Sequence, residues 1–312
     1  HSKRKKAMKN SIGIIGMGWV GASVAISLLH KGVCRELLVN DVRNDIAEGE
    51  AMDLNHGTSF FSAANIRAVS IGEMRDCNAI VVTAGKGGTE GQSRLDLLNE
   101  NLKIAKGISN ELKGFNGILI IVANPVDVLT YFYQKYTGLP ANRVIGTGTF
   151  LDSARLREVI GNKLNLEPKT IHAQVIGEHG DSSVFLWSKA TIGGTVIREW
   201  EGWKPEYEKE IEDEVRSAAA EIIKRKGATN HAIGVVTATL LKWIMRGERR
   251  VVTLSTVLDS TFEYGQIAMS LPVLISDIGI ERVVKLNLHP NEEMDIVKSA
   301  KIISNAIESA KS

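Results

Sequence analysis

The segment Ser11–Gly21 reads SIGIIGMGWVG, and it decides how the first part of the chain folds. Its apolar run ends at Gly16, and Gly16, Gly18 and Gly21 then follow the spacing G-x-G-x-x-G. The residues that come next, Trp19–His30, have the composition of a helix. Glycines at these positions allow a tight turn between a buried strand and a helix. We therefore predict a strand, a glycine turn and a helix in direct succession.

The next apolar segment, ELLVND, ends at Asp41, 20 residues after Gly21. An acid at this distance completes the fingerprint of a dinucleotide-binding unit. Gly18 would let the backbone approach a pyrophosphate, which the helix N-terminus attracts. Asp41 would accept hydrogen bonds from an adenosine ribose and repel a 2′-phosphate, so we predict NAD rather than NADP. The alternatives are FAD, or glycines that only form a turn beside an aspartate that only caps a helix.

Short apolar runs alternate with amphipathic segments through the first half of the chain. Such runs are typical of parallel strands that helices cover on both faces. We predict an α/β fold whose N-terminal domain, residues 11–148, is a Rossmann-type, doubly wound parallel sheet. The predicted strands are Ser11–Gly16, Glu36–Asp41, Ala79–Gly85, Gly117–Asn124 and Arg143–Gly148, and the predicted helices are Trp19–His30, Asp45–Leu54, Leu95–Leu112 and Val126–Tyr136.

The pattern changes near residue 149, where longer helices and irregular apolar runs begin. We predict a C-terminal α+β catalytic domain over residues 149–312, with an antiparallel sheet and a strand kinked at Pro272. The predicted helices are Asp152–Gly161, Glu206–Lys226, Ala232–Met245 and Glu292–Ala310, and the predicted strand segments read TIHAQVIG, SSVFLWSKATIGG, RRVVTLSTVLDS and QIAMSLPVLISDIGI.

The net charge of the 312 residues is +2, from 38 Lys and Arg against 36 Asp and Glu. Five of these cations lie in the first ten residues, HSKRKKAMKN, so the rest of the chain carries +2 − 5 = −3. We interpret residues 1–10 as a basic tail and expect no nucleic-acid partner. A nucleic-acid or targeting arm is the alternative.

No apolar run approaches the length of a membrane span, so we expect no membrane association. The two cysteines, Cys34 and Cys77, lack the spacing of metal ligands. We therefore expect no metal site, no disulfide framework and a cytoplasmic location.

Three polar residues of the second half form a candidate catalytic group. His179 lies between glycines in GEHGDSS, and Asp152 and Arg155 lie in FLDSARLR. Because Asp152 and Arg155 are three residues apart, they share a face of the predicted helix. The arginine suits a carboxylate, the histidine exchanges a proton near neutral pH, and the aspartate can fix the tautomer of the histidine. Taken singly, they also fit a turn histidine, a helix cap and a surface charge.

Several motifs, spread from about residue 11 to residue 310, resemble the L-lactate/malate dehydrogenase family. Besides the glycine fingerprint they are SRLDLLNEN (93–101), ANPVDVLT (123–130), VIGTGTFLDSARLR (144–157) and VIGEHGDSS (175–183). The resemblance implies that His179 is the proton donor and acceptor, that Asp152 is its partner and that Arg155 anchors the substrate carboxylate. It also implies that Asn124 hydrogen-bonds near substrate and nicotinamide, beside a cis proline, Pro125.

The segment AGKGGTEGQSR (84–94) is too rich in glycine for a helix or strand. By the resemblance, it is a lid over cofactor and substrate. Arg94 would swing in on closure and polarise the substrate carbonyl oxygen, where a fixed positive charge is useful. The remaining cofactor contacts that the resemblance implies are Met17, Trp19, Val20, Thr83, Ala84, Gly85, Asn99, Val122, Asn124 and Ile233.

In relatives, the lid residue six positions before the lid arginine selects the substrate by its side chain. In this chain that residue is Gly88. Lactate enzymes usually carry glutamine there and malate enzymes arginine, so neither rule is met. Gly88 offers no charge for a second carboxylate, whereas Thr229 and Ile233 match lactate enzymes. We expect pyruvate and L-lactate as substrates. A malate dehydrogenase, with a charge from Lys86 or Lys106, and an L-2-hydroxy-acid dehydrogenase for larger apolar 2-oxo acids are the alternatives.

Two further residues match the positions at which many bacterial relatives bind fructose 1,6-bisphosphate between subunits. These are Arg157 and His172, and both residue types suit a phosphate dianion. The resemblance also implies a homo-oligomer, for which we expect a tetramer, with a dimer as the alternative. An NAD-binding sensor or structural protein without turnover is the non-enzymatic alternative.

Overall fold

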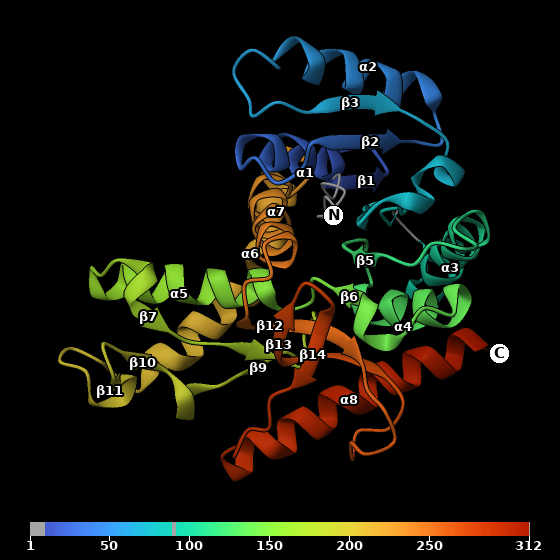
Figure 1. The fold of residues 1–312 in the computed structure, drawn as a ribbon. Coiled ribbons are helices and arrows are strands. Elements are labelled where there is room, and N and C mark those ends of the chain that lie inside the picture. Colours follow the sequence, from blue (N-terminus) through green and yellow to red (C-terminus); the bar gives the residue numbers. More distant parts are fainter. Residues whose placement is uncertain (1–9, 89–91, 312) are drawn as a thin grey trace, which may run out of the picture.

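The computed structural model describes residues 10–88 and 92–311. The predicted basic tail therefore lies, except for Asn10, outside the described residues. Within them, nine strands form one sheet in the order β14-β13-β12-β6-β5-β4-β1-β2-β3. Figure 1 shows this sheet running through the molecule, with β7, β10 and β11 at the lower left, to one side of β12 and β13.

The strands of the large sheet are β1 (Ser11–Ile15), β2 (Glu36–Asn40), β3 (Asn65–Ala68), β4 (Ala79–Val82), β5 (Ile118–Ile121), β6 (Val144–Gly146), β12 (Arg250–Val257), β13 (Ala268–Ser276) and β14 (Gly279–Val283). Two small sheets contain β7 (Ile171–His172), β10 (Thr191–Ile192) and β11 (Thr195–Val196), and β8 (Val175–Ile176) and β9 (Val184–Phe185).

The α-helices are α1 (Trp19–His30), α2 (Asn44–His56), α3 (Arg94–Glu111), α4 (Val126–Thr137), α5 (Phe150–Leu164), α6 (Glu206–Lys226), α7 (His231–Met245) and α8 (Pro290–Lys311). Short 3-10 helices cover Ile71–Asp76, Ala141–Arg143, Pro168–Thr170, Trp187–Lys189 and Ile197–Glu199.

The predicted doubly wound sheet is confirmed. Strands β3-β2-β1-β4-β5-β6 are all parallel, in the order 3-2-1-4-5-6 of a Rossmann fold. Every residue of β1, β4 and β5 is buried, which explains why these strands appear in the sequence as unbroken apolar runs. The edge strand β3 was not predicted, because Ile66 is its only buried residue.

The three long antiparallel strands of the second half, β12, β13 and β14, do not form a separate sheet. Strand β12 pairs antiparallel with β6, with Ser255 opposite Gly146, so that β12, β13 and β14 extend the parallel sheet. The predicted kink at Pro272 is wrong in position. Pro272 pairs in register with Thr253, and the register shifts two residues later, between Leu274 and Ile275.

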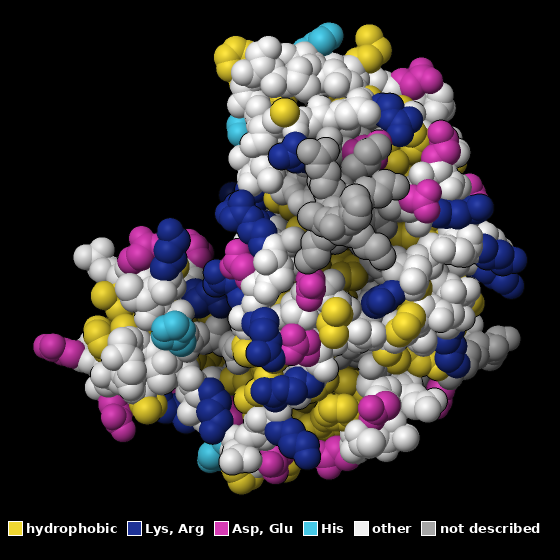
Figure 2. Space-filling model, viewed as in Figure 1, with side chains coloured by type: hydrophobic (Ala, Val, Ile, Leu, Met, Phe, Trp, Pro, Cys, Tyr) yellow, Lys and Arg dark blue, Asp and Glu magenta, His cyan; other side chains and the backbone are white. Residues whose placement is uncertain are grey.

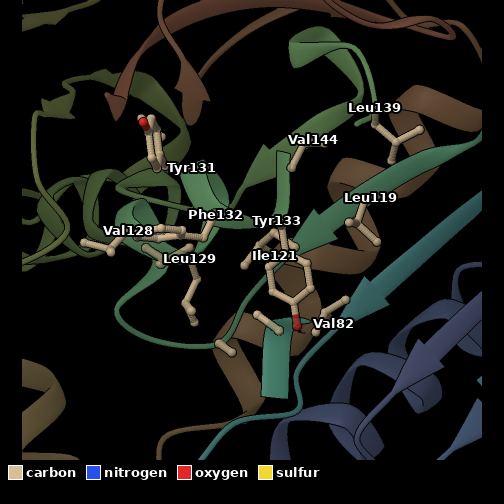
Figure 3. Close-up of a cluster of buried hydrophobic side chains, with 14 of the residues drawn as sticks. Val82, Leu119, Ile121, Val128, Leu129, Tyr131, Phe132, Tyr133, Leu139 and Val144 are labelled. Atoms are coloured by element: carbon tan, nitrogen blue, oxygen red, sulfur yellow. The ribbon is translucent and has the colours of Figure 1, made fainter. Parts of the chain in front are cut away.

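Helix α4 packs on the centre of the parallel sheet. In Figure 3, Leu129, Phe132 and Tyr133 of α4 lie in one buried cluster with Val82 of β4, Leu119 and Ile121 of β5 and Val144 of β6. Both faces of the helix are buried over most of its length, because α8 packs on it as well. This burial fixes the first turn of α4, which lies at the carboxyl end of β5.

The surface shows no dominant charge of either sign on the face seen in Figure 2, where Lys and Arg are interspersed with Asp and Glu. Among residues 10–88 and 92–311, no helix is long and apolar enough to cross a membrane. Cys34 and Cys77 are buried thiols, and burial raises the pKa of Cys77 to about 11.

Candidate active site

The glycine turn after β1 is tightly packed at two positions and open at the third. Gly16 has a φ of +99°, and the Thr83 hydroxyl donates to its carbonyl oxygen at 2.6 Å. A Cβ atom on Gly21 would collide with that same carbonyl oxygen, whereas one on Gly18 would meet no atom of the described residues within 4 Å. The open side at Gly18 faces the start of α1, where no side chain caps the helix and no acid lies in the first turn. The turn therefore fits a pyrophosphate.

Asp41 is held against this turn. Its Oδ2 accepts the backbone N–H of Met17 at 2.8 Å, and its Oδ1 accepts that of Arg43 at 3.0 Å. The Met17 side chain is buried in the core, so only the backbone of this residue faces the predicted cofactor site. Trp19, the first residue of α1, is 59% exposed beside the open position of Gly18.

The residues after β4 and β5 are joined by an asparagine that the sequence analysis missed. Asn101 of α3 is 2% exposed. Its Oδ1 accepts the N–H of Lys86 at 2.7 Å, and its amide donates to the carbonyl of Asn124 at 3.1 Å. Asn99 is exposed and lies two residues earlier, about 200° away around the helix, so its contact with the cofactor remains a prediction. The sequence signal that could have identified Asn101 was an amide side chain at a position that shares the helical spacing of the buried residues of α3.

Thr83, Ala84 and Gly85 come directly after β4, and Val122 and Asn124 directly after β5, so all five lie at the carboxyl edge of the sheet. The N–H of Ala84 donates to the carbonyl of Ile15 at 2.9 Å, which holds this segment beside the glycine turn. The Asn124–Pro125 peptide bond is cis, as expected from the resemblance. Ligands of open α/β sheets bind at this edge.

His179, Asp152 and Arg155 meet, as predicted. Nδ1 of His179 lies 2.6 Å from Oδ2 of Asp152, and Nη1 of Arg155 donates to Oδ1 of Asp152 at 3.0 Å. Asp152 is in the first turn of α5, and Arg155 is one turn further on. Asp152 therefore lies between the imidazole and the guanidinium, and the side chains of His179, Asp152 and Arg155 are 26%, 11% and 13% exposed.

Burial and charge act against each other in this cluster. Burial alone would lower the pKa of His179, but the charge and hydrogen bond of Asp152, with the charge of Asp127, raise it above its ordinary value. Burial would raise the pKa of Asp152, but His179 and Arg155 lower it below its ordinary value. At neutral pH Asp152 is thus ionised, and it favours a proton on Nδ1 of the histidine. Nε2 is then the ring nitrogen left for proton exchange.

The loop that carries His179 is anchored at three successive backbone N–H groups. Gly177 donates to the carbonyl of Ser270 in β13, Glu178 to the hydroxyl of Ser299 in α8, and His179 to Oδ2 of Asp127 in α4, all at 2.8 Å. Asp127 was not predicted as a site residue. Its signal was a charge within VDVLT (126–130), where every residue is buried and Asp127 is 3% exposed.

Arg94 does not join the cluster. It is the first residue of α3, its side chain is 98% exposed, and its guanidinium lies 3.9 Å from the carboxylate of Asp181. Asp181 is two residues after His179, so the arginine lies at the rim of the site. Gly88 is exposed, and residues 89–91 of the predicted lid are outside the described part of the chain. The closure of the lid remains a prediction.

Ile233 lies in the first turn of α7, and Thr229 comes two residues before this helix, which packs against α1. The amide of Asn230 donates to the hydroxyl of Ser23 in α1 at 2.7 Å, and a Cβ on Gly234 would collide with Ser23. Ile233 packs against the core cluster that contains Met17. This close contact of α1 with α7 places both predicted residues between the two halves.

Arg157 and His172 line one cavity of about 440 Å³. Lys169 and Lys189 line it too, and they add two cations that the sequence analysis did not include. Nη1 of Arg157 donates to the carbonyl of Ala173 at 3.4 Å, which turns the guanidinium along the cavity wall. Among the described residues, no group of three or more His, Cys, Asp or Glu side chains is placed to hold a metal ion.

Comparisons with known proteins agree with this geometry. Residues 10–146 match the NAD binding domain of the lactate/malate dehydrogenase family, and residues 149–312 match its alpha/beta C-terminal domain. The chain is 44% identical to an L-lactate dehydrogenase of Fervidobacterium nodosum, over 96% of this chain and 98% of the relative. It is 40% identical to one of Synechococcus, over 97% and 99%.

Solved structures give the same result. A lactate dehydrogenase from a Medee basin deep-sea metagenome library superimposes with a TM-score of 0.94 at 35% identity, covering 97% of this chain and 99% of that one. The minor L-lactate dehydrogenase of Enterococcus mundtii gives a TM-score of 0.92 at 36% identity, covering 96% and 98%. The chain belongs to the lactate/malate dehydrogenase family.

Proposed function

We propose that this chain is an NAD-dependent L-lactate dehydrogenase, in which residues 11–148 bind NAD and residues 149–312 supply the catalytic group. The observation that carries the proposal is the contact of His179 and Arg155 with the two oxygens of Asp152. A proton-exchanging imidazole and a carboxylate-binding guanidinium share one buried anion at the edge of a dinucleotide fold. The names of the most similar relatives support lactate as the substrate.

The glycine turn and Asp41 would hold NAD, which would supply the hydride acceptor or donor. In the direction of pyruvate reduction, Arg155 pairs with the substrate carboxylate through the guanidinium donors that do not bind Asp152. Protonated His179 donates from Nε2 to the carbonyl oxygen as that oxygen gains negative charge. Asp152 stabilises the imidazolium before the transfer. In lactate oxidation, neutral His179 accepts the hydroxyl proton.

Arg94 completes the site in this proposal when its segment closes. The guanidinium leaves the exposed position near Asp181 and approaches the substrate oxygen, where it stabilises the developing charge. Closure also removes water, which strengthens that interaction.

Pyruvate is proposed over oxaloacetate because Gly88 carries no charge for a second carboxylate. Among the described residues, a Cβ on Gly88 would touch only Leu97, at 3.4 Å, so the position has room for larger apolar substrate side chains. The test is NADH oxidation with pyruvate, oxaloacetate and branched 2-oxo acids, measured side by side. We expect pyruvate to have the highest kcat/KM. A higher value with oxaloacetate would contradict the substrate, and NADH binding without any turnover would favour a sensor.

We also propose that a sugar bisphosphate binds at Arg157 and His172. Three cations and a histidine around one cavity support a phosphate ligand, and the exposed Val251 at its rim supports a second copy of the chain across it. Titration with fructose 1,6-bisphosphate should lower the KM for pyruvate. It should also favour a homo-oligomer, which we expect to sediment as a tetramer. Arg157→Gln should remove both responses. No binding at millimolar concentration would contradict the effector.

A further inference from the structure

The buried carboxylate of Asp127 has no part in the function proposed above. It lies in the first turn of α4, 52 residues before His179 in the sequence, and is 3% exposed. It does not cap its own helix. Instead, Oδ2 accepts the backbone N–H of His179 at 2.8 Å. A buried charge is costly unless it is hydrogen-bonded and paired, so this position calls for a physical reason.

Its second oxygen makes that reason more specific. Oδ1 of Asp127 is buried without a hydrogen-bond partner among the described residues, and so is the hydroxyl of Ser255 in β12. The Ser255 hydroxyl is near enough to lower the pKa of Asp127, although the two atoms do not meet hydrogen-bond geometry. The carboxylate is thus only half satisfied by neutral donors. The remaining compensation for its charge comes from a nearby positive group.

Protonated His179 is the group that fits. The charges that face the imidazole are Asp152 and Arg155 from α5 and Asp127 from α4, while Glu178 of the histidine loop also faces Asp127. Arg155 disfavours a positive imidazole, and the two aspartates favour it. Without Asp127, one buried anion would face one guanidinium and one imidazolium. With it, two anions face the two cations, and the cluster is balanced when His179 carries its proton.

We propose that Asp127 is a positioning residue, which fixes the backbone of His179 and supplies the second negative charge that stabilises its protonated ring. This inference rests on the proposed role of His179 as the proton donor. The Asp127 side chain thus acts in two ways, through its hydrogen bond to the His179 backbone and through its charge.

Burial raises the pKa of Asp127 to about 6, against the opposing effects of Ser255 and His179. The carboxylate is therefore ionised at pH 7 and above, where pyruvate reduction depends on keeping His179 protonated. Below about pH 6 it becomes neutral and its support is lost, but His179 is then protonated in any case. The effect of the Asp127 charge should thus appear mainly on the alkaline side of the activity profile.

The experiment compares three variants of the full chain in kcat/KM for pyruvate between pH 5 and 10. Asp127→Asn keeps an oxygen that accepts the His179 N–H and removes the charge, and its new N–H donors face the free Ser255 hydroxyl. Ser299→Ala is the matched control, because it removes an uncharged anchor of the same loop at Glu178. Ser255→Ala leaves Asp127 in place and makes its ionised form less stable.

We expect Asp127→Asn to move the alkaline limb to lower pH by about 0.5–1 unit, with a smaller fall at low pH. Ser255→Ala should move it in the same direction by less. Ser299→Ala should lower kcat/KM by the same factor at every pH and leave the pH of the alkaline limb unchanged. NADH affinity, measured by fluorescence, should stay within about twofold in all three, which shows that each variant is folded.

An unshifted limb in Asp127→Asn would overturn the proposal, and so would an equal shift in Ser299→Ala, since either result leaves only a structural anchor. If Asp127→Asn fails to bind NADH, Ser255→Ala decides alone, and an unshifted limb there contradicts the proposal. Absence of pyruvate turnover in the wild-type chain would instead contradict the proposed function, which keeps the two failures distinct.

Discussion

The glycine turn and the histidine cluster are built in opposite ways. The turn from Gly16 to Gly21 forms within one strand-helix junction, and its acidic partner Asp41 lies 24 residues from Met17. The loop of His179 depends on Asp152, 27 residues away, on Asp127, 52 away, and on Ser299, which is 121 residues from Glu178. Cofactor binding should therefore tolerate damage to the histidine loop, whereas catalysis should not.

The sharpest test of this difference is His179→Asn. Removal of a general acid lowers rates by factors of 10² to 10⁴, so kcat/KM for pyruvate should fall about a thousandfold. NADH should still bind with unchanged affinity, because the turn is assembled without the histidine loop. A loss of NADH binding in this variant would break the comparison.

Arg94→Ala should have the next largest effect. Loss of one group that stabilises a developing oxyanion costs a factor of about 10² in kcat. The side chain is almost fully exposed and makes one long contact with Asp181, so thermal stability should not change. Steady-state kinetics and a melting curve check both expectations. A turnover close to wild type would remove Arg94 from the mechanism.

Asp152→Asn tests the electrostatics of the cluster. The pKa of His179 is raised in the folded protein mainly because Asp152 outweighs the effect of burial. Pyruvate reduction uses the protonated ring, so kcat/KM falls as the pH rises through this raised pKa. Without the charge, burial lowers that pKa, and the limb should move to lower pH by about 1–2 units, with a loss of about tenfold at neutral pH. A limb that stays in place would mean that another group titrates.

The smallest effects should come from two glycines of the turn. Gly18→Ala meets open space, so the melting temperature should stay constant while NADH affinity falls several-fold, because the methyl group occupies the predicted phosphate path. Gly21→Ala collides with the carbonyl of Gly16, and overpacking of this kind costs about 1–3 kcal/mol of stability. Equal melting temperatures for the two variants would show that the turn is not packed as described.

Sequence patterns predicted the structure best where it depends on residues close together in the chain. The buried strands β1, β4 and β5 and the helix α1 follow from apolar runs, glycine spacing and helix periodicity. Strand β3 was missed because a half-exposed edge strand has little apolar signal. The predicted residues of the catalytic group came from motifs, while Asp127 and Asn101 were missed because their burial depends on segments far away in the chain.

The sequence by itself determined the parallel nucleotide fold, the choice of NAD and the residue types of the catalytic group, since each depends on neighbours within a few turns of chain. Only the tertiary structure decided that β12–β14 extend the same sheet, that Arg94 lies outside the histidine cluster, and that Asp127 holds the histidine backbone. The reason is physical. Pairing of distant strands and the pKa values of buried charges depend on which segments pack together, and no local pattern of residues encodes those contacts.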